Sequence, residues 1–204
     1  MIATEVDWAQ KYRPQTIDEV ILSDELKRKL SRIVKHSGGM SLLFWGRPGC
    51  GKTTVAKLIN PEDTVLINCS TNNSIDTVRW MESNFVTGTL TGNRRLLLLD
   101  EADNLSQDAQ AALRGVSELL SANNDFVLTA NDPNRLSEAV RSRFLPVEFN
   151  LAQSESRLLV CKRLREIADL EGCVDVTDEV LDRSMKFYPD LRRTIKTLQF
   201  ELTE

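Results

Sequence analysis

The sequence lacks several of the residue patterns on which common site chemistries depend. It contains one histidine, His36, which excludes most histidine-based metal sites and catalytic triads. Its four cysteines form no CxxC pair, so we expect reduced thiols rather than disulfides or a zinc site. It has no apolar run long enough for a membrane span, and its start, MIATEVDWAQ, lacks the apolar core of a signal peptide. We therefore expect no membrane partner.

Strong charge bias is also missing. The formal net charge of the 204 residues is −4, which neither favours nor excludes a nucleic-acid partner, because a local basic patch decides that. Hydrophobic residues make up 41% and charged residues 27% of the chain, a balance that supports a real core. The length suits one large domain, or a medium domain followed by a small one.

Strand and helix patterns alternate over roughly residues 1–150. The apolar runs SLLFW, TVLINC, RLLLLD, DFVLTA and PVEF are typical of short buried strands, and helical patterns lie between them. RLLLLD is an unbroken apolar run bounded by charge, as expected of a strand buried on both faces of a parallel sheet. The alternation predicts an α/β fold with a doubly wound parallel sheet.

From Ser154 onward the pattern predicts helices only. The three segments are SESRLLVCKRLREIADLEG, TDEVLDRSMKFY and DLRRTIKTLQFEL, and each opens on a residue that commonly caps a helix. We therefore expect two domains, an α/β nucleotide-binding domain over 1–150 and a small all-helical lid over 151–204. Three helices of this length are too few to be strongly stable without a neighbour.

The segment GRPGCGKT, residues 46–53, matches the pattern G-x-x-x-x-G-K-[ST] between a predicted strand and a predicted helix. Its glycines let successive backbone N–H groups point inward at phosphate oxygens. Lys52 would place a charge near the β- and γ-phosphates, and Thr53 would offer a hydroxyl to Mg²⁺. The expected nucleotide-binding residues here are Gly46, Pro48, Gly49, Cys50, Gly51, Lys52, Thr53 and Thr54.

Acidic and amide side chains follow the next predicted strands. LLLLDEAD places Asp100 and Glu101 at the C-terminal end of a buried strand, where ligands bind in such sheets. Asp100 suits the outer shell of Mg²⁺, and Glu101 suits the base that polarises the attacking water. In LTAND, the amide of Asn131 could hold that water, although Asn before Asp-Pro is also a common turn residue. Nucleotide binding without hydrolysis is the alternative, and Glu101 counts against it.

Taken in order, these motifs resemble those of the AAA+ ATPases, and among them the clamp-loader subunits of the T-even bacteriophage and replication factor C small-subunit type. The resemblance spans nearly the whole chain. The motifs that carry it are KYRPQTIDEVI, GRPGCGKTTVAK, LINCS, LLLLDEAD, LTAND, VRSRF and PDLRRTIKTLQ. It implies that Tyr12, Arg13 and Pro14 lie against the adenine and its phosphates. It also implies that Arg192 of the lid contacts the γ-phosphate.

The resemblance identifies VRSRF as an arginine-finger motif, with Arg143 as the catalytic arginine. If the strand order is that of the family, Arg143 cannot easily reach its own nucleotide but can reach a neighbour's. The alternative is a surface arginine that offsets the dipole at a helix end, and Arg141 is the next candidate for the finger. The family usually has cysteine where this sequence has Phe144.

The DNA-facing part of the family motif is only partly present. Arg79 and Ser74, with neighbouring Thr and Asn side chains at the start of a predicted helix, could hold a backbone phosphate of DNA. A plain solvated helix is the alternative. The family often has basic residues after this arginine, whereas here Trp80, Met81 and Glu82 follow. Arg114, on the helix after Asp100, is a further candidate for coupling the nucleotide state to a neighbouring subunit.

The resemblance implies an ATPase that uses ATP and Mg²⁺ and, with other clamp-loader subunits, loads a ring-shaped sliding clamp onto primer–template DNA. Its location would be the cytoplasm of a bacterial or phage-infected cell, or a eukaryotic nucleus. The family continues with a helical collar, whereas this sequence stops at Glu204, so a truncated chain and a collarless relative are both open. The alternative functions are a branch-migration or transposition ATPase and a non-enzymatic, nucleotide-dependent assembly module.

Overall fold

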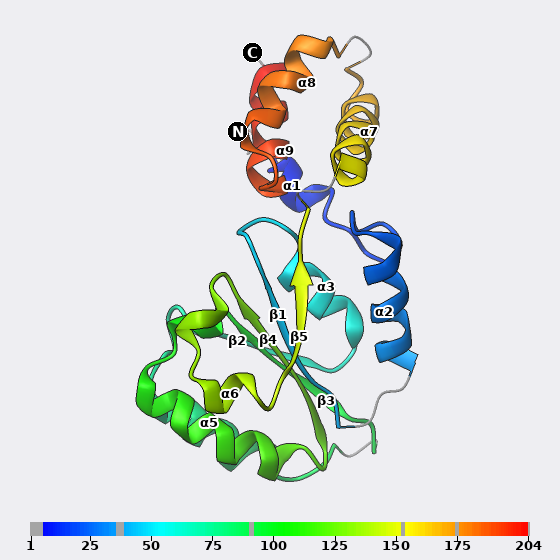
Figure 1. The fold of residues 1–204 in the computed structure, drawn as a ribbon. Helices are drawn as coiled ribbons and strands as arrows, with labels where there is room; N and C mark the ends of the chain where they lie inside the picture. Colours follow the sequence, from blue (N-terminus) through cyan, green and yellow to red (C-terminus); the bar gives the residue numbers. More distant parts are fainter. Residues whose placement is uncertain (1–5, 36–38, 90–91, 152–153, 174–175, 204) are drawn as a thin grey trace, which may run out of the picture. The chain divides into compact units, whose positions relative to one another are not determined.

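A computed structural model describes residues 6–35, 39–89, 92–151, 154–173 and 176–203 of the chain (Figure 1). His36 lies outside these residues. The chain folds as two compact units. The α/β unit contains residues 28–46 and 52–149, and the helical unit contains residues up to 27, residues 47–51 and residues from 150 onward. Helix α2 (Asp24–Lys35) joins the two units along the chain.

The α/β unit is built on a five-stranded sheet in which every strand pair is parallel, as predicted. The strand order is β2-β3-β4-β1-β5. The strands are β1 (Ser41–Gly46), β2 (Thr64–Asn68), β3 (Arg95–Asp100), β4 (Asn124–Ala130) and β5 (Leu145–Phe149). All seven residues of β4 are buried, as are the four leucines of β3, because helices cover both faces of the sheet.

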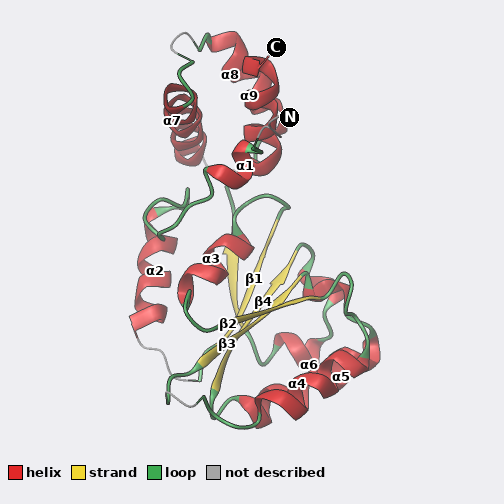
Figure 2. Cartoon of the chain, turned by 180° about the vertical axis from the view of Figure 1, so that it is seen from behind, coloured by secondary structure: helices red, strands yellow, loops and turns green. Residues whose placement is uncertain are grey.

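The connecting helices of the α/β unit occupy both faces of the sheet (Figure 2). Apolar residues of α4, α5 and α6 share one core cluster with residues of β1, β2, β3 and β4, whereas α3 lies on the other side. The elements are α3 (Lys52–Ile59), α4 (Ile75–Phe85), the 3₁₀ helix η1 (Ala102–Asn104), α5 (Gln107–Leu120), the 3₁₀ helix η2 (Pro133–Arg135) and α6 (Glu138–Arg141). This is the doubly wound α/β arrangement that the sequence predicts.

The start of α5 is held in place by side chains. Ser106 caps the helix, since its Oγ accepts a 3.2 Å hydrogen bond from the backbone N–H of Ala109. Gln110 is buried, and its amide donates to the carbonyls of Leu105 and Arg135 and accepts from the N–H of Ser137. Gln110 therefore ties α5 to the turns that precede α6.

The helical unit contains the three predicted helical segments and one helix that the sequence did not predict. They are α1 (Trp8–Lys11), α7 (Ser154–Leu170), α8 (Asp178–Ser184) with the 3₁₀ helix η3 (Met185–Phe187), and α9 (Leu191–Thr203). Buried Trp8 of α1 packs in one apolar cluster with residues of α7, α8 and α9. Its backbone N–H donates a 2.9 Å hydrogen bond to Gln199 of α9, so this N-terminal segment belongs to the core of the helical unit.

All four cysteines lie in the described part of the chain, and the structure places none of them in a disulfide. Among the described residues, no helix combines the length and the apolar composition that a membrane span requires.

Candidate functional site

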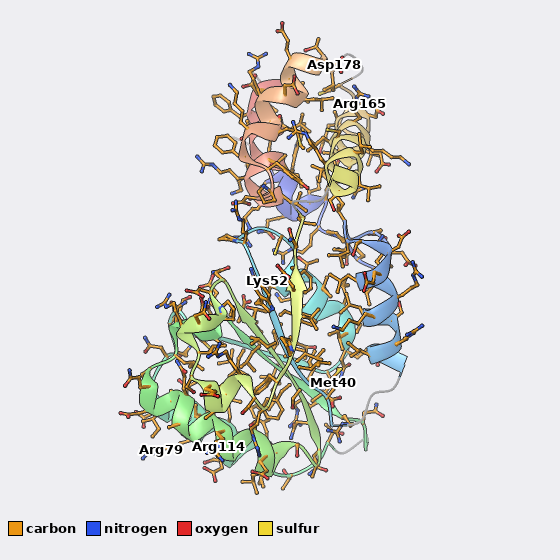
Figure 3. All side chains as sticks on the ribbon, in the orientation of Figure 1. Met40, Lys52, Arg79, Arg114, Arg165 and Asp178 are labelled. Carbon is orange, nitrogen blue, oxygen red and sulfur yellow. The ribbon has the colours of Figure 1, made fainter. Side chains whose placement is uncertain are left out.

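Lys52 is the first residue of α3 and is almost completely buried, at 7% exposure. Its Nζ donates hydrogen bonds to the Gly46 carbonyl at 2.8 Å and to Asn131 Oδ1 at 2.9 Å. The second bond forms because β4 lies beside β1, with Ala130 opposite Trp45, so that both strands end at the same edge. Figure 3 shows Lys52 close to this edge of the sheet. The predicted phosphate lysine and the predicted water-holding amide are thus in contact.

Asp100 lies at the end of β3 and receives two hydroxyl groups. Thr53 Oγ1 and Thr129 Oγ1 each donate to Asp100 Oδ1 at 2.6 Å. Thr129 Oγ1 in turn accepts a 2.9 Å bond from the backbone N–H of Glu101. Sequence reasoning missed Thr129, although a lone hydroxyl in an otherwise apolar buried stretch, FVLTA, signals a buried partner. Hydroxyl and carboxylate oxygens together are the hard ligands that Mg²⁺ prefers.

Glu101 has an unusual backbone conformation. Its φ is +56°, in the left-handed region, and among the described residues other than glycine it is alone in this. Its carboxylate accepts hydrogen bonds from Ser70 Oγ and, at 3.4 Å, from Asn104 Nδ2. Ser70 follows β2, and the backbone N–H of Cys69 donates to the Asp100 carbonyl at 2.8 Å. The loop after β2 therefore holds the candidate base, a role of Ser70 that the sequence did not indicate.

Asp103, in η1, fixes the turn that carries Asn131. It is 4% exposed, and its Oδ2 accepts hydrogen bonds of 3.1 Å from the backbone N–H groups of both Asn131 and Asp132. The turn after β4 is thereby tied to the turn after β3.

Burial and the acidic residues of this site raise the pKa of a neighbouring thiol. Burial, and then the charges of Asp100, Asp103 and Glu101, raise the pKa of Cys69 to about 12.

The glycines of the phosphate loop have conformations that other residues rarely adopt. Gly46 has a φ of +151°, and a Cβ there would overlap the Phe149 carbonyl oxygen of the adjacent strand. Gly49 has a φ of +74°, and a Cβ there would overlap the carboxylate of Asp190. The Gly49 carbonyl also accepts a 3.3 Å bond from the backbone N–H of Leu191, at the start of α9. In the helical unit, residues 47–51 thus pack against the N-terminal end of α9.

The predicted adenine-side and lid residues lie in the helical unit. Tyr12 follows α1, and its hydroxyl donates a 2.8 Å bond to Glu171, which also pairs with Lys11 at 2.8 Å. Burial, and then the bond to Glu171, raise the pKa of Tyr12. Arg192 is the second residue of α9. The nucleotide-binding roles of Tyr12, Arg13, Pro14, Pro48, Cys50, Thr54 and Arg192 stay predictions.

Arg143 lies at the opposite end of the α/β unit from Gly46 and Lys52. It comes two residues before Leu145, which pairs with Leu42 at the start of the strands, whereas Gly46 pairs with Phe149 at their end. Its Nε donates a 3.1 Å bond to the Arg114 carbonyl, and its terminal nitrogen forms an ion pair with Glu118. Figure 3 shows Lys52 and Arg114 at opposite ends of this unit.

The candidate DNA-contacting residues are exposed. Arg79 pairs with Asp76 at 3.4 Å on the surface of α4, and the Ser74 side chain makes no capping hydrogen bond. Trp80 is 48% exposed and meets the ring of Phe85 edge-on. A DNA contact at Arg79 and Ser74 stays a prediction.

Residues 42–150 match the model of a family described as "ATPase family associated with various cellular activities (AAA)". The chain is 36% identical over 211 residues to replication factor C small subunit 2 of Pyrobaculum aerophilum, covering 98% of this chain and 65% of that protein. It is 35% identical over 209 residues to the replication factor C small subunit of Staphylothermus marinus, covering 97% of this chain and 62% of that protein. The chain thus spans slightly less than two thirds of the length of these relatives.

Solved structures are similar in fold. A RuvB variant of Thermotoga maritima has a TM-score of 0.70 at 22% identity, covering 92% of this chain and 64% of that chain. A DNA polymerase III gamma subunit-related protein of the same organism has a TM-score of 0.58 at 20% identity, covering 85% of this chain and 70% of that chain. At these identities the likeness shows the fold alone.

Proposed function

The chain belongs to the AAA family of ATPases, and from this premise we propose that it hydrolyses ATP as a subunit of a clamp-loader-like assembly. One observation carries the proposal. Five side chains whose chemistry suits phosphoryl transfer gather at the C-terminal edge of one parallel sheet, although 79 residues separate the first from the last. These residues are Lys52, Thr53, Asp100, Glu101 and Asn131.

The residues of the site fit ATP and Mg²⁺. Lys52 would bind the β- and γ-phosphates, and the N–H groups of the loop between Gly46 and Lys52 would surround them. The Thr53 hydroxyl and the Asp100 carboxylate, already 2.6 Å apart, would hold Mg²⁺. When bound, the ion would neutralise charge that develops on the phosphate oxygens.

Glu101 and Asn131 would act on the attacking water. Glu101 would accept a proton from it, while Ser70 and Asn104 orient the carboxylate. Asn131 already uses its amide oxygen to accept from Lys52, so its amide N–H groups would serve as donors to the water or to the γ-phosphate. Asp103 would hold the backbone of Asn131 in place.

We propose that Arg143 completes the site of a neighbouring subunit. The register of β1 and β5 spans four residue steps between Leu42 and Gly46, or about 13 Å at roughly 3.3 Å per residue. Arg143 precedes the start of this span and the phosphate loop follows its end. Reaching its own γ-phosphate is therefore difficult for Arg143, and a like or related subunit would supply the site into which it projects.

The partners follow from the likeness to relatives named replication factor C small subunits. As partners of this chain we propose other clamp-loader subunits, a ring-shaped sliding clamp and primer–template DNA. Arg79 and Ser74 would contact the DNA backbone, and the assembly would act in the cytoplasm of a cell without a nucleus. The order of KYRP, VRSRF and DLRRTI along the chain favours this function over branch migration.

Mass photometry with an ATP analogue, with and without primed DNA, tests whether the chain assembles. In a verified assembly we expect primed DNA to stimulate ATP hydrolysis, with binding that weakens as salt rises and ignores base sequence, since phosphate contacts dominate. Arg79→Ala should weaken DNA binding by a similar modest factor on every sequence. Base-specific recognition, or an assembly whose turnover ignores DNA, would contradict the proposal.

A further inference from the structure

The guanidinium of Arg143 is fixed to the second half of α5 by two different groups. Its Nε donates a 3.1 Å hydrogen bond to the main-chain carbonyl of Arg114, and its Nη2 forms an ion pair with the carboxylate of Glu118. The Arg143 side chain is 28% exposed, whereas that of Glu118 is 73% exposed. The arginine is thus partly enclosed, and the carboxylate reaches to it from the solvent side of the helix.

The parts that hold Arg143 are themselves rigid. Leu113 and Val116 of α5 are buried in the main core cluster, so the Arg114 carbonyl belongs to a firmly packed helix. Phe144, next to Arg143 in the chain, is 2% exposed and meets the ring of Phe126 edge-on with centroids 6.4 Å apart. Packing of Phe144 therefore fixes the backbone of Arg143, while α5 fixes its charged end.

The anchored guanidinium keeps donors for a ligand. A guanidinium has five N–H donors in a planar fork, and the two contacts to α5 involve only its Nε and Nη2 nitrogens. A phosphate oxygen approaching the outer edge of the fork would find N–H groups pointing at it. It would also find a side chain that has already lost much of its rotamer freedom, which is the usual advantage of preorganisation.

We infer that Glu118 is a positioning residue for Arg143, holding the guanidinium on α5 in the orientation in which it enters a neighbour's site. The inference rests on the proposed function, because it requires that Arg143 act on ATP bound to another subunit. As an exposed ion pair, Glu118–Arg143 would contribute little to stability alone. Its effect should therefore show in turnover.

The test measures turnover at saturating ATP, and KM for ATP, in the verified assembly. Glu118→Ala should lower turnover by roughly 3- to 10-fold while KM changes by less than about twofold, because ordering of Arg143 matters in the transition state. Glu118→Gln should lose less turnover, since its amide oxygen can still accept a hydrogen bond from Arg143. Glu118→Lys should lose more turnover, because its positive charge would repel the Arg143 guanidinium. Asp108→Ala, which removes the same charge from the other end of α5, is the matched control and should change neither value.

A double-mutant cycle separates positioning from a general structural effect. Glu118→Ala should have no further effect on turnover when Arg143 is already Ala. Urea unfolding of the single chain should give nearly the same midpoint for wild type and Glu118→Ala, because an exposed ion pair contributes little to stability. Unchanged or faster turnover in Glu118→Ala, or an equal loss of turnover in the Arg143→Ala background, would overturn the inference. A wild-type assembly without ATP turnover would instead refute the proposed function on which the inference rests.

Discussion

Lys52 Nζ donates a 2.9 Å hydrogen bond to Asn131 Oδ1, which joins the start of α3 to the turn after β4. Two predicted site residues are therefore in direct contact. The turn is further tied to Asp103, and Asp103 lies three residues after the acid that receives the Thr53 hydroxyl. A phosphate that binds Lys52 would thus act on groups already connected to the candidate base and the candidate metal ligands.

Lys52 and Glu101 should affect different steps. Lys52→Ala removes the cation that would meet the β- and γ-phosphates, so ATP affinity should fall by roughly 100-fold or more, as the loss of charge-assisted hydrogen bonds implies. Glu101→Gln should keep ATP affinity within about threefold and stall hydrolysis, because an amide cannot accept a proton from water. Titration with a fluorescent ATP analogue and steady-state phosphate release measure the two effects. Equal losses of affinity in both variants would refute this division.

Gly49 should not tolerate a side chain. In Gly49→Ala the residue would have to adopt a φ of +74°, and its Cβ would overlap the Asp190 carboxylate and lie 3.1 Å from Asp190 Cα. We expect a loss of at least about 1–2 kcal/mol of stability, together with weaker ATP binding.

Gly115→Ala is the matched control for Gly49→Ala. Gly115 lies within α5, and a Cβ added to it would meet no atom of the described residues within 4 Å, leaving aside its own helix backbone and chain neighbours. Alanine should therefore stabilise the helix by about 1 kcal/mol. Urea unfolding compares the two variants, and a Gly49→Ala chain as stable as wild type would contradict the loop conformation.

Arg94 should matter for stability and little for nucleotide binding. Its guanidinium bonds to Asp125 at 3.0 Å and to the carbonyls of Ala122, Ser121 and Asn124, all at or just before the start of β4. Arg94→Ala would leave a buried carboxylate without its cation and should cost about 2–3 kcal/mol. Exposed Arg141→Ala should stay within about 0.5 kcal/mol of wild type. Equal urea midpoints for the two variants would contradict this account.

Cys69 should react slowly with alkylating reagents in the native protein. Burial and the nearby acids raise the pKa of its thiol to about 12, so the thiol stays protonated at pH 8 and gains reactivity only as the pH rises toward that value. Cys161 and Cys173 are partly exposed and should be labelled first by iodoacetamide at pH 8. Peptide mass spectrometry follows the order of labelling, and early labelling of Cys69 would place its thiol in a different environment.

The sequence predicted those features that depend on local pattern. Unbroken apolar runs such as RLLLLD identified the buried parallel strands. Lys52, Asp100 and Asn131 were placed at one sheet edge because parallel strands end together. Each inference needs only a few neighbouring residues and a general rule of sheet geometry.

Other features depend on contacts between distant segments. The packing of Trp8 with α9 links residues more than 180 positions apart, and no local pattern signals it. Ser70 contacts Glu101 only because β2 lies beside β3, and Glu118 contacts Arg143 only because the chain returns to α5 after α6. The functional division of the chain at residue 150 stays a prediction.

The most direct test of the account is subunit mixing with Arg143→Ala. In a verified assembly, Arg143→Ala should bind ATP normally yet hydrolyse it roughly 10³-fold more slowly, the scale of an arginine supplied to phosphoryl transfer. Glu101→Gln subunits should be equally slow. Mixing the two should restore part of the activity, because a Glu101→Gln subunit still offers an intact arginine to a neighbour whose own base is intact. Undiminished turnover of Arg143→Ala in the oligomer would contradict the account, and Arg141 would then be the next residue to test.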